Sequence, residues 1–259
     1  MAPDPDFAVE PIPAFNDNYL WLLVRGPEAA VVDPGDAAPV LQRLAQRNLR
    51  LRAILVTHHH GDHVGGVADL AQATGARVCG PGGEQIPARD VALAGGERID
   101  VLGAAFDVLA VPGHTLGHIA YHSPELRTLF CGDTLFAAGC GRVFEGTAAQ
   151  MHASLARLAG LPADTRVFCA HEYTLDNLRF ALAVEPGSEA LRRRQLACAA
   201  KRERGEPTVP STIAEELATN PFLRCDEPAV RRAAEARAGR PLATTEAVFA
   251  AIREWKNAF

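Results

Sequence analysis

The sequence lacks an excess of positive charge. It contains 26 lysine and arginine residues against 31 aspartate and glutamate residues, a formal net charge of −5 at pH 7. Because nucleic-acid-binding chains normally show a basic excess, we predict no nucleic-acid partner. No apolar run approaches the roughly 18 residues that a membrane span needs. The segment 1–15, MAPDPDFAVEPIPAF, has neither the cationic start nor the apolar core of a signal peptide. We therefore predict no membrane association.

Paired cysteines and the common nucleophile motifs are also missing. The six cysteines form no CxxC pair and no dense cluster, so we interpret them as small buried residues rather than as metal ligands or disulfides. This usage favours a reducing, cytoplasmic setting. No GxSxG elbow and no lysine nucleophile is evident, because lysine occurs only at Lys201 and Lys256.

The chain of 259 residues is 48% hydrophobic and 22% charged, as expected of a globular protein with one large or two small domains. Up to about Thr174, short β-like runs alternate with helical spacing at 39–47 and 147–158. The expected strands are 19–24, 29–33, 53–57, 106–111, 119–122, 128–132 and 167–170. Beyond Thr174 the β-like runs stop, and breaks at proline and glycine predict four or five helices. We predict a domain at 1–174 and a helical domain at 175–259.

The segment Thr57–His63, THHHGDH, directly follows an apolar run. Imidazole and carboxylate groups hold catalytic Zn²⁺-like ions. In a non-helical loop, residues two apart can face the same way, so His58 and His60 can bind one ion while His59 points away. Gly61 allows a sharp turn, after which Asp62 and His63 can face a second ion. The alternative, a solvated loop that happens to be rich in histidine, is disfavoured because four of the nine histidines fall here.

Similar donors recur where later strands open into loops. His114 lies in VPGHT after the run 106–111, Asp133 lies in CGDT after 128–130, and His171 follows VFCA. A lone histidine at a strand end is more often structural than a ligand. The series taken together predicts a metal centre.

The series THHHGDH, GHT, GDT and AHEYT resembles the metallo-β-lactamase superfamily, and the finer similarity is to glyoxalase II, the hydroxyacylglutathione hydrolases. The similarity extends through GCGRVFEGTAAQM, NPFLR and the terminal IREWK. It implies a four-layer αββα sandwich of two mixed β-sheets followed by an all-helical domain. It also implies hydrolysis of the thioester of S-(2-hydroxyacyl)glutathione, notably S-D-lactoylglutathione in methylglyoxal detoxification.

The resemblance implies two divalent metal ions, with zinc favoured and iron or manganese as alternatives. One ion would be bound by His58, His60 and His114, and the other by Asp62, His63 and His171, with Asp133 bridging them. His118 belongs to the GHTxGH pattern as a supporting residue rather than a ligand. We interpret His122 as a strand residue and His152 as a surface helix residue.

Two such ions would lower the pKa of a shared water towards about 7 and supply a hydroxide that attacks the thioester carbonyl. Asp62 would orient this hydroxide as a catalytic residue. A thiol, with a pKa near 8.5, can leave as the thiolate without an acid catalyst. No cysteine nucleophile is needed.

The last helix places Arg253 and Lys256 three residues apart on one flank. Two neighbouring cations suit the carboxylates of glutathione, although they could also be an exposed basic helix end. The resemblance favours glutathione binding and adds Arg142, Phe144 and Tyr173. Arg142 stands where lysine is common in the family and Phe144 where tyrosine is common, which could weaken glutathione binding or allow another thiol carrier.

Two other activities of the superfamily are possible alternatives. A mononuclear-iron persulfide dioxygenase would lack the full second ligand set and the long helical tail. A nuclease would carry a basic arm or a large accessory domain, and neither is visible here. A non-enzymatic role would leave the intact ligand set without a purpose. We further predict a monomer whose partner is the small-molecule glutathione thioester.

Overall fold

The structure is a computed structural model that describes residues 7–259. The chain divides into two compact units. The first unit comprises 7–110 and 115–132, and the second comprises Val111–His114 and Asp133–Phe259. The boundaries of these units differ from those of the predicted domains, 1–174 and 175–259. The domain boundary after residue 174 stays a prediction.

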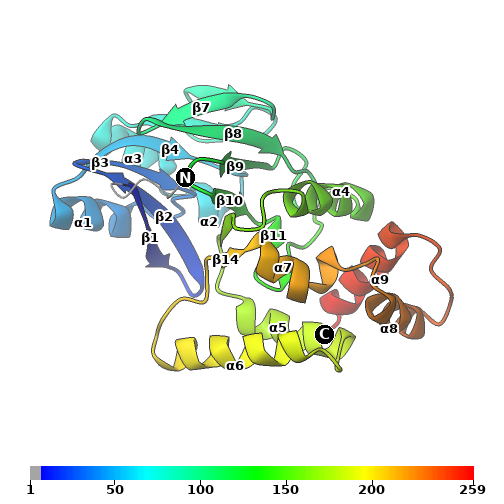
Figure 1. Ribbon diagram of the computed structural model, residues 1–259. Coiled ribbons are helices and arrows are strands. Elements are labelled where there is room, and N and C mark those ends of the chain that lie inside the picture. Colours follow the sequence, from blue (N-terminus) through cyan, green and yellow to red (C-terminus); the bar gives the residue numbers. More distant parts are fainter. Residues whose placement is uncertain (1–6) are drawn as a thin grey trace. The chain divides into compact units, whose positions relative to one another are not determined.

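One sheet of the first unit is a mixed sheet of six strands (Figure 1). Its strands follow chain order, antiparallel from β1 to β3 and parallel from β3 to β6. The strands are β1 (Phe7–Ala14), β2 (Asn18–Arg25), β3 (Glu28–Val32), β4 (Arg50–Leu55), β5 (Arg77–Pro81) and β6 (Val91–Leu93). The runs NYLWLLVR of β2 and EAAVV of β3 are almost wholly buried, which explains their continuous hydrophobicity.

Two helices cover one face of this sheet. They are α1 (Ala37–Arg47) and α3 (Val67–Thr74), and a single turn, α2 (Gly61–Val64), precedes α3. The apolar side chains of α1 and α3 pack in one core with those of β1–β5. Asp36 caps α1 by accepting a hydrogen bond from the backbone N–H of Ala38.

Four strands of a second, six-stranded sheet lie in the first unit and form an antiparallel meander. They are β7 (Arg98–Val101), β8 (Ala104–Ala110), β9 (Ile119–Ser123) and β10 (Thr128–Gly132). The fully buried Tyr121 of β9 donates hydrogen bonds to the carbonyl oxygens of Val56 and Cys79, at 2.8 and 3.2 Å. These bonds tie the meander to the parallel part of the first sheet.

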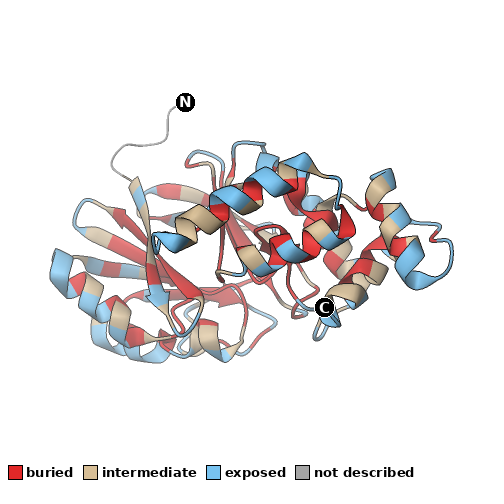
Figure 2. Ribbon diagram, turned by 90° about the horizontal axis from the view of Figure 1, so that it is seen from below, coloured by how far each residue is buried: buried red, intermediate tan, exposed pale blue. Residues whose placement is uncertain are grey.

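The second unit is mainly helical. It begins with a short hairpin, β11 (Leu135–Phe136) and β12 (Gly139–Cys140), and contains the strand pair β13 (Arg166–Cys169) and β14 (Ser211–Thr212). Its helices are α4 (Ala148–Ala159), α5 (Thr174–Val184), α6 (Glu189–Glu203), α7 (Ile213–Thr219), η1 (Pro221–Leu223), α8 (Pro228–Ala238) and α9 (Thr245–Asn257). Figure 2 shows buried and exposed residues alternating along these helices, as expected of amphipathic elements.

The seven expected strands correspond to β2, β3, β4, β8, β9, β10 and β13, and the five α-helices beyond residue 173 confirm the expected helical tail. The predicted elements did not include β1, β5, β6, β7, β11, β12, β14 or α3. The loop expected after residue 57 contains a helical turn, since Asp62 and His63 lie in α2. Among the helices of residues 7–259, none is long and apolar enough to cross a membrane.

Candidate metal centre and substrate pocket

The histidine-rich segment leaves the carboxyl end of β4, beside the end of β3. There, Asp33 accepts hydrogen bonds from the backbone N–H and the hydroxyl of Thr57, both at 2.7 Å. Asp33 has a positive φ of 50°, and its side chain is only 4% exposed. The buried carboxylate therefore fixes where the histidine-rich segment begins.

Within the first unit, four predicted ligands lie close together. The ring atoms His58 Nε2 and His60 Nδ1 are 3.2 Å apart, and the ring centroids of His58 and His63 are 4.0 Å apart. His63 Nε2 lies 3.4 Å from Asp62 Oδ2, which also accepts a 2.9 Å hydrogen bond from Asn18. His58 and His63 are fully buried.

The hydrogen bonds of this cluster indicate the tautomer of His58. The Thr57 hydroxyl donates its proton to Asp33, so at 3.1 Å it accepts the Nδ1 proton of His58. The Nε2 atom of His58 then carries the lone pair that a metal ligand needs. Asp33 Oδ2 also lies 3.1 Å from His63 Nδ1. The buried carboxylate of Asp33 therefore lies beside His63 and is linked to His58 through Thr57.

The second unit brings together His114, Asp133 and His171. Asp133 Oδ2 lies 3.4 Å from His114 Nε2, and Asp133 Oδ1 lies 3.4 Å from His171 Nε2. A carboxylate with each oxygen beside a different imidazole is suited to bridge two cations. His114 Nδ1 donates to the Arg142 carbonyl at 2.8 Å, which again leaves the Nε2 lone pair directed to the carboxylate.

Neutral imidazoles and carboxylates are ligands that suit divalent ions such as zinc, iron or manganese. The buried donors of each unit therefore fit a divalent metal site chemically.

A pocket of about 380 Å³ lies within the second unit. All five predicted substrate residues line it, together with two predicted ligands. The lining residues are His114, Asp133, Phe136, Cys140, Arg142, Phe144, Tyr173, Asp176, Asn177, Arg253 and Lys256. Phe144 is 62% exposed and Tyr173 37% exposed. Two aromatic surfaces therefore remain accessible beside the predicted ligands His114 and His171, against whose rings they pack.

Two cations of α9 form part of the pocket wall. The buried Arg253 donates to the Cys140 carbonyl at 2.9 Å, and Lys256 Nζ donates to the Asp176 carbonyl at 3.2 Å. Burial, and then the charge of Arg253, lower the pKa of Lys256 to about 8. The ammonium of Lys256 therefore loses its proton close to the physiological pH range.

A buried polar network holds the hairpin β11–β12 that forms one side of the pocket. Asn220 Nδ2 donates to the carbonyls of Phe136 and Gly139, at 3.1 and 2.8 Å. The backbone N–H of Ala138 donates to Glu216 at 2.8 Å. Both Asn220 and Glu216 are 0% exposed.

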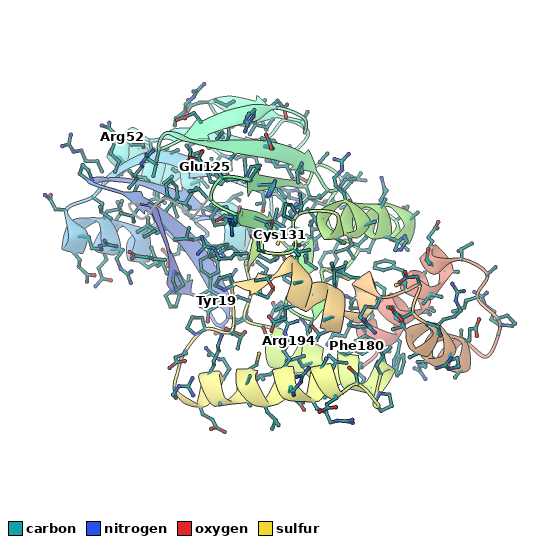
Figure 3. All side chains as sticks on the ribbon, in the orientation of Figure 1. Tyr19, Arg52, Glu125, Cys131, Phe180 and Arg194 are labelled. Atoms are coloured by element: carbon teal, nitrogen blue, oxygen red, sulfur yellow. The ribbon has the colours of Figure 1, made fainter. Side chains whose placement is uncertain are left out.

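The charge of Glu216 is balanced inside the second unit. Arg194 of α6, labelled in Figure 3, donates to Glu216 at 2.6 Å and is itself buried. A buried carboxylate needs such a partner. The helical tail therefore supplies the partners for backbone groups that a hairpin of two-residue strands cannot satisfy by itself.

Three residues near the predicted ligands were not predicted from the sequence: Asn18, Asp33 and Glu84. Asp33 had a signal, because it ends an apolar strand and precedes Pro34–Gly35. Asn18 and Glu84 had none. Glu84 is a buried carboxylate beside His59.

Two histidines outside the predicted ligand set and all six cysteines are buried. His118 is buried and stacks on His58 at 4.6 Å. His122 is buried in β9, and burial lowers its pKa. All six cysteines are buried and unbridged, which confirms their interpretation as small buried residues.

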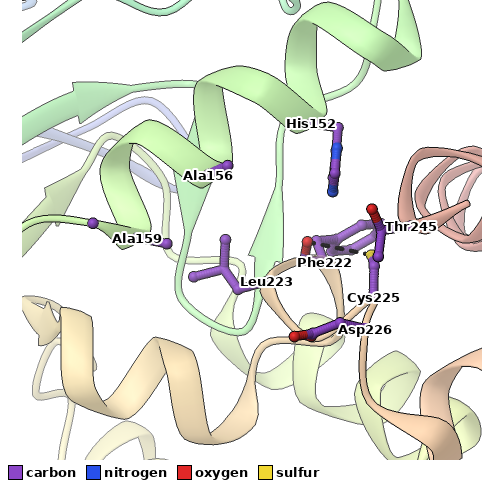
Figure 4. A pocket seen from close by; sticks show the side chains of 9 residues that line it. His152, Ala156, Ala159, Phe222, Leu223, Cys225, Asp226 and Thr245 are labelled. Carbon is purple, nitrogen blue, oxygen red and sulfur yellow. Dashed lines mark hydrogen bonds between the residues drawn. The ribbon is translucent and has the colours of Figure 1, made fainter.

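Another hollow of the second unit, of about 400 Å³, is lined by His152, Ala156, Phe222 and Cys225 among others (Figure 4). The Cys225 thiol donates to the carbonyls of Pro221 and Phe222. None of the predicted site residues belongs to the lining described for this hollow.

The chain matches two family models that together span most of its length. Residues 15–171 match the metallo-β-lactamase superfamily, and residues 172–259 match the hydroxyacylglutathione hydrolase C-terminus. Its relatives include the hydroxyacylglutathione hydrolases of Pseudomonas aeruginosa (strain LESB58), 62% identical, and Dechloromonas aromatica (strain RCB), 57% identical. These alignments cover 97% and 96% of this chain, and 99% and 98% of the relatives.

Among solved structures, the chain is similar to ETHE1 from Myxococcus xanthus, with a TM-score of 0.63 and 25% identity over 97% of this chain and 98% of that one. The expected fold class, a metallo-β-lactamase fold of two β-sheets with a helical C-terminal part, is confirmed.

Proposed function

We propose that the chain, which belongs to the hydroxyacylglutathione hydrolase family within the metallo-β-lactamase superfamily, works with two divalent metal ions. As a member of this family it is a thioester hydrolase that acts on S-(2-hydroxyacyl)glutathione. The alternative activity, a persulfide dioxygenase, is not favoured, since residues 172–259 match the hydrolase C-terminus. The product of lactoylglutathione hydrolysis would be D-lactate and glutathione.

The observation that carries the two-ion proposal is the set of buried, oriented donors. We assign His58, His60 and His114 to one ion, Asp62, His63 and His171 to the other, and Asp133 to both. Support comes from the Nε2 lone pair of His58, which its contact with the Thr57 hydroxyl indicates, and from the buried His63, whose Nδ1 lies 3.1 Å from Asp33 Oδ2. Further support comes from Asp133, whose two oxygens face two different imidazoles. Zinc suits this nitrogen-rich set, although iron or manganese can occupy it.

Metal ions held by these residues would supply hydroxide at neutral pH and a Lewis acid for the thioester carbonyl. Asp62 is the proposed catalytic residue. Its carboxylate is 40% exposed and accepts a hydrogen bond from Asn18, so it can orient the attacking hydroxide. The departing thiol has a pKa near 8.5 and leaves as the thiolate, so no side chain is needed as an acid.

We assign the binding of the glutathione part to Arg142, Phe144, Tyr173, Arg253 and Lys256. Guanidinium and ammonium groups bind the two carboxylates of glutathione, and the exposed faces of Phe144 and Tyr173 offer apolar contact beside the thioester. The pocket volume of about 380 Å³ is in the range of small-molecule sites.

The wider setting of the enzyme is also a proposal. The net charge of −5 supports the absence of a nucleic-acid partner, and the six unbridged thiols support a reducing cytoplasm. We propose a monomer that acts on a small-molecule substrate without membrane association.

Elemental analysis of the purified chain, combined with release of thiol from S-D-lactoylglutathione, tests the proposal. We expect about two metal ions per chain. The variant Asp133→Ala should lose turnover and metal while circular dichroism shows a retained fold. Lys256→Met is the matched control, because it should raise KM and keep the metal content. A folded, metal-loaded protein that cleaves no glutathione thioester would refute the assigned activity.

A further inference from the structure

Glu84 is a buried carboxylate that the proposed reaction does not use. It follows β5, and its side chain is only 3% exposed. An ionised group this deeply buried needs hydrogen-bonding or charged partners to be stable. All the partners described for its carboxylate lie in two other segments of the first unit.

One oxygen of Glu84 binds the turn 115–117. Glu84 Oε1 accepts a 3.0 Å hydrogen bond from the backbone N–H of Gly117 and a further one from the hydroxyl of Thr115. The approach is so close that a Cβ atom on Gly117 would lie 2.5 Å from Glu84 Cγ. A side chain at position 117 would therefore push the carboxylate away.

The other oxygen faces the histidine-rich segment. Glu84 Oε2 lies 3.1 Å from Nδ1 of His59, the residue between the proposed ligands His58 and His60. A single carboxylate thus lies between the segment that carries two proposed ligands and the turn that directly follows the proposed ligand His114 in the chain.

We infer that Glu84 is a positioning residue for the metal ligands, an inference that rests on the proposed metal-dependent function. It acts through the backbone of two segments rather than by contact with an ion. Two neighbouring contacts support this arrangement: His118 stacks on His58 at 4.6 Å, and Ile119 N–H donates to the Thr57 carbonyl at 3.0 Å. Removing the carboxylate leaves the N–H of Gly117 and the hydroxyl of Thr115 without their acceptor and removes the oxygen that lies 3.1 Å from His59 Nδ1. We therefore expect weaker metal binding.

The test measures zinc affinity by competition with a chromophoric chelator, using metal-free parent chain and variants. Loss of a supporting residue typically weakens metal binding about 10- to 100-fold, and we expect this for Glu84→Ala. Glu84→Gln, which keeps an acceptor oxygen, should recover part of the affinity. Thr115→Val, which deletes one of the bonds, should show a smaller loss even if Glu84→Ala fails to fold. The KM for S-D-lactoylglutathione should stay within about twofold of the parent, because the substrate pocket belongs to the second unit.

Glu97→Ala is the matched control. Glu97 lies in the same unit and accepts hydrogen bonds from the backbone N–H groups of Ala94 and Gly95, both at 2.7 Å, but it contacts no proposed ligand segment among the residues described. It should lower the melting temperature without changing zinc affinity. The inference is overturned if Glu84→Gln and Thr115→Val both bind zinc as tightly as the parent, or if Glu97→Ala weakens binding equally. A parent chain that binds none of zinc, iron and manganese overturns the proposed two-ion function as well, whereas an active parent with unaffected variants overturns only the role of Glu84.

Discussion

Lys256 should make the efficiency of the enzyme fall as the pH rises through the weakly alkaline range. Its pKa is lowered to about 8 by burial and by the nearby charge of Arg253. The ammonium is therefore about nine-tenths charged at pH 7, about half charged at pH 8 and about one-tenth charged at pH 9. If the charged form alone binds a substrate carboxylate, kcat/KM decreases about tenfold between the low-pH limit and pH 9, because this ratio follows the ionisation of the free enzyme.

The assay compares the parent chain with Lys256→Arg across pH 6.5 to 9.5, following loss of the thioester absorbance. A guanidinium stays charged throughout this range, so the variant should lack the decrease. Ionisation of the substrate and of the attacking water affects both proteins equally, and the ratio of their kcat/KM values isolates Lys256. A ratio that stays constant across the whole range would refute the reasoning.

Three further substitutions test other parts of the structure. Asn220→Ala leaves the buried carbonyls of Phe136 and Gly139 without a donor, so we expect a loss of about 3 kcal/mol in the free energy of unfolding. Urea titration measures this loss. Asn257→Ala, at an exposed position, should leave the free energy of unfolding unchanged. Phe144→Tyr adds a hydroxyl at an exposed position of the pocket and should lower KM about two- to tenfold, for one hydrogen bond of about 0.5–1.5 kcal/mol; a KM that is unchanged or higher contradicts this. Gly132→Ala should destabilise the chain by about 2–4 kcal/mol, because φ is +46° and the new Cβ would lie 2.3 Å from the Thr57 hydroxyl; an equal melting temperature would count against that packing.

The elements that the sequence predicts correctly are those with strong local signals. The buried runs of β2 and β3 and the helical spacing of α4 are visible without any knowledge of the fold. Strand β1 was missed because Pro11 and Pro13 interrupt its pattern. Proline is tolerated at a sheet edge, and β1 is an edge strand, next to β2 in the order of its sheet.

Polar residues at strand ends could likewise be predicted, because each follows an apolar run and belongs to a recognisable motif. The contacts that the supporting residues make could not be predicted. Asp33 bonds Thr57, 24 residues later, and Glu84 bonds Thr115, 31 residues later. No periodic pattern or motif in the sequence links the two residues of either pair, and only folding brings them into contact. The helical turn of Asp62 and His63 was missed for a related reason, since GDHV is too short for a periodic signal.

The burial of all six cysteines has a practical consequence for measuring this enzyme. Burial raises the pKa of Cys140, and it raises that of Cys169 to about 12, so little thiolate is available to a disulfide reagent at neutral pH. A colorimetric reagent that reacts with released glutathione should therefore give almost no background from the native chain. Each denatured molecule would add six equivalents of thiol. The absorbance of a blank without substrate therefore also measures the fraction of folded protein in a preparation.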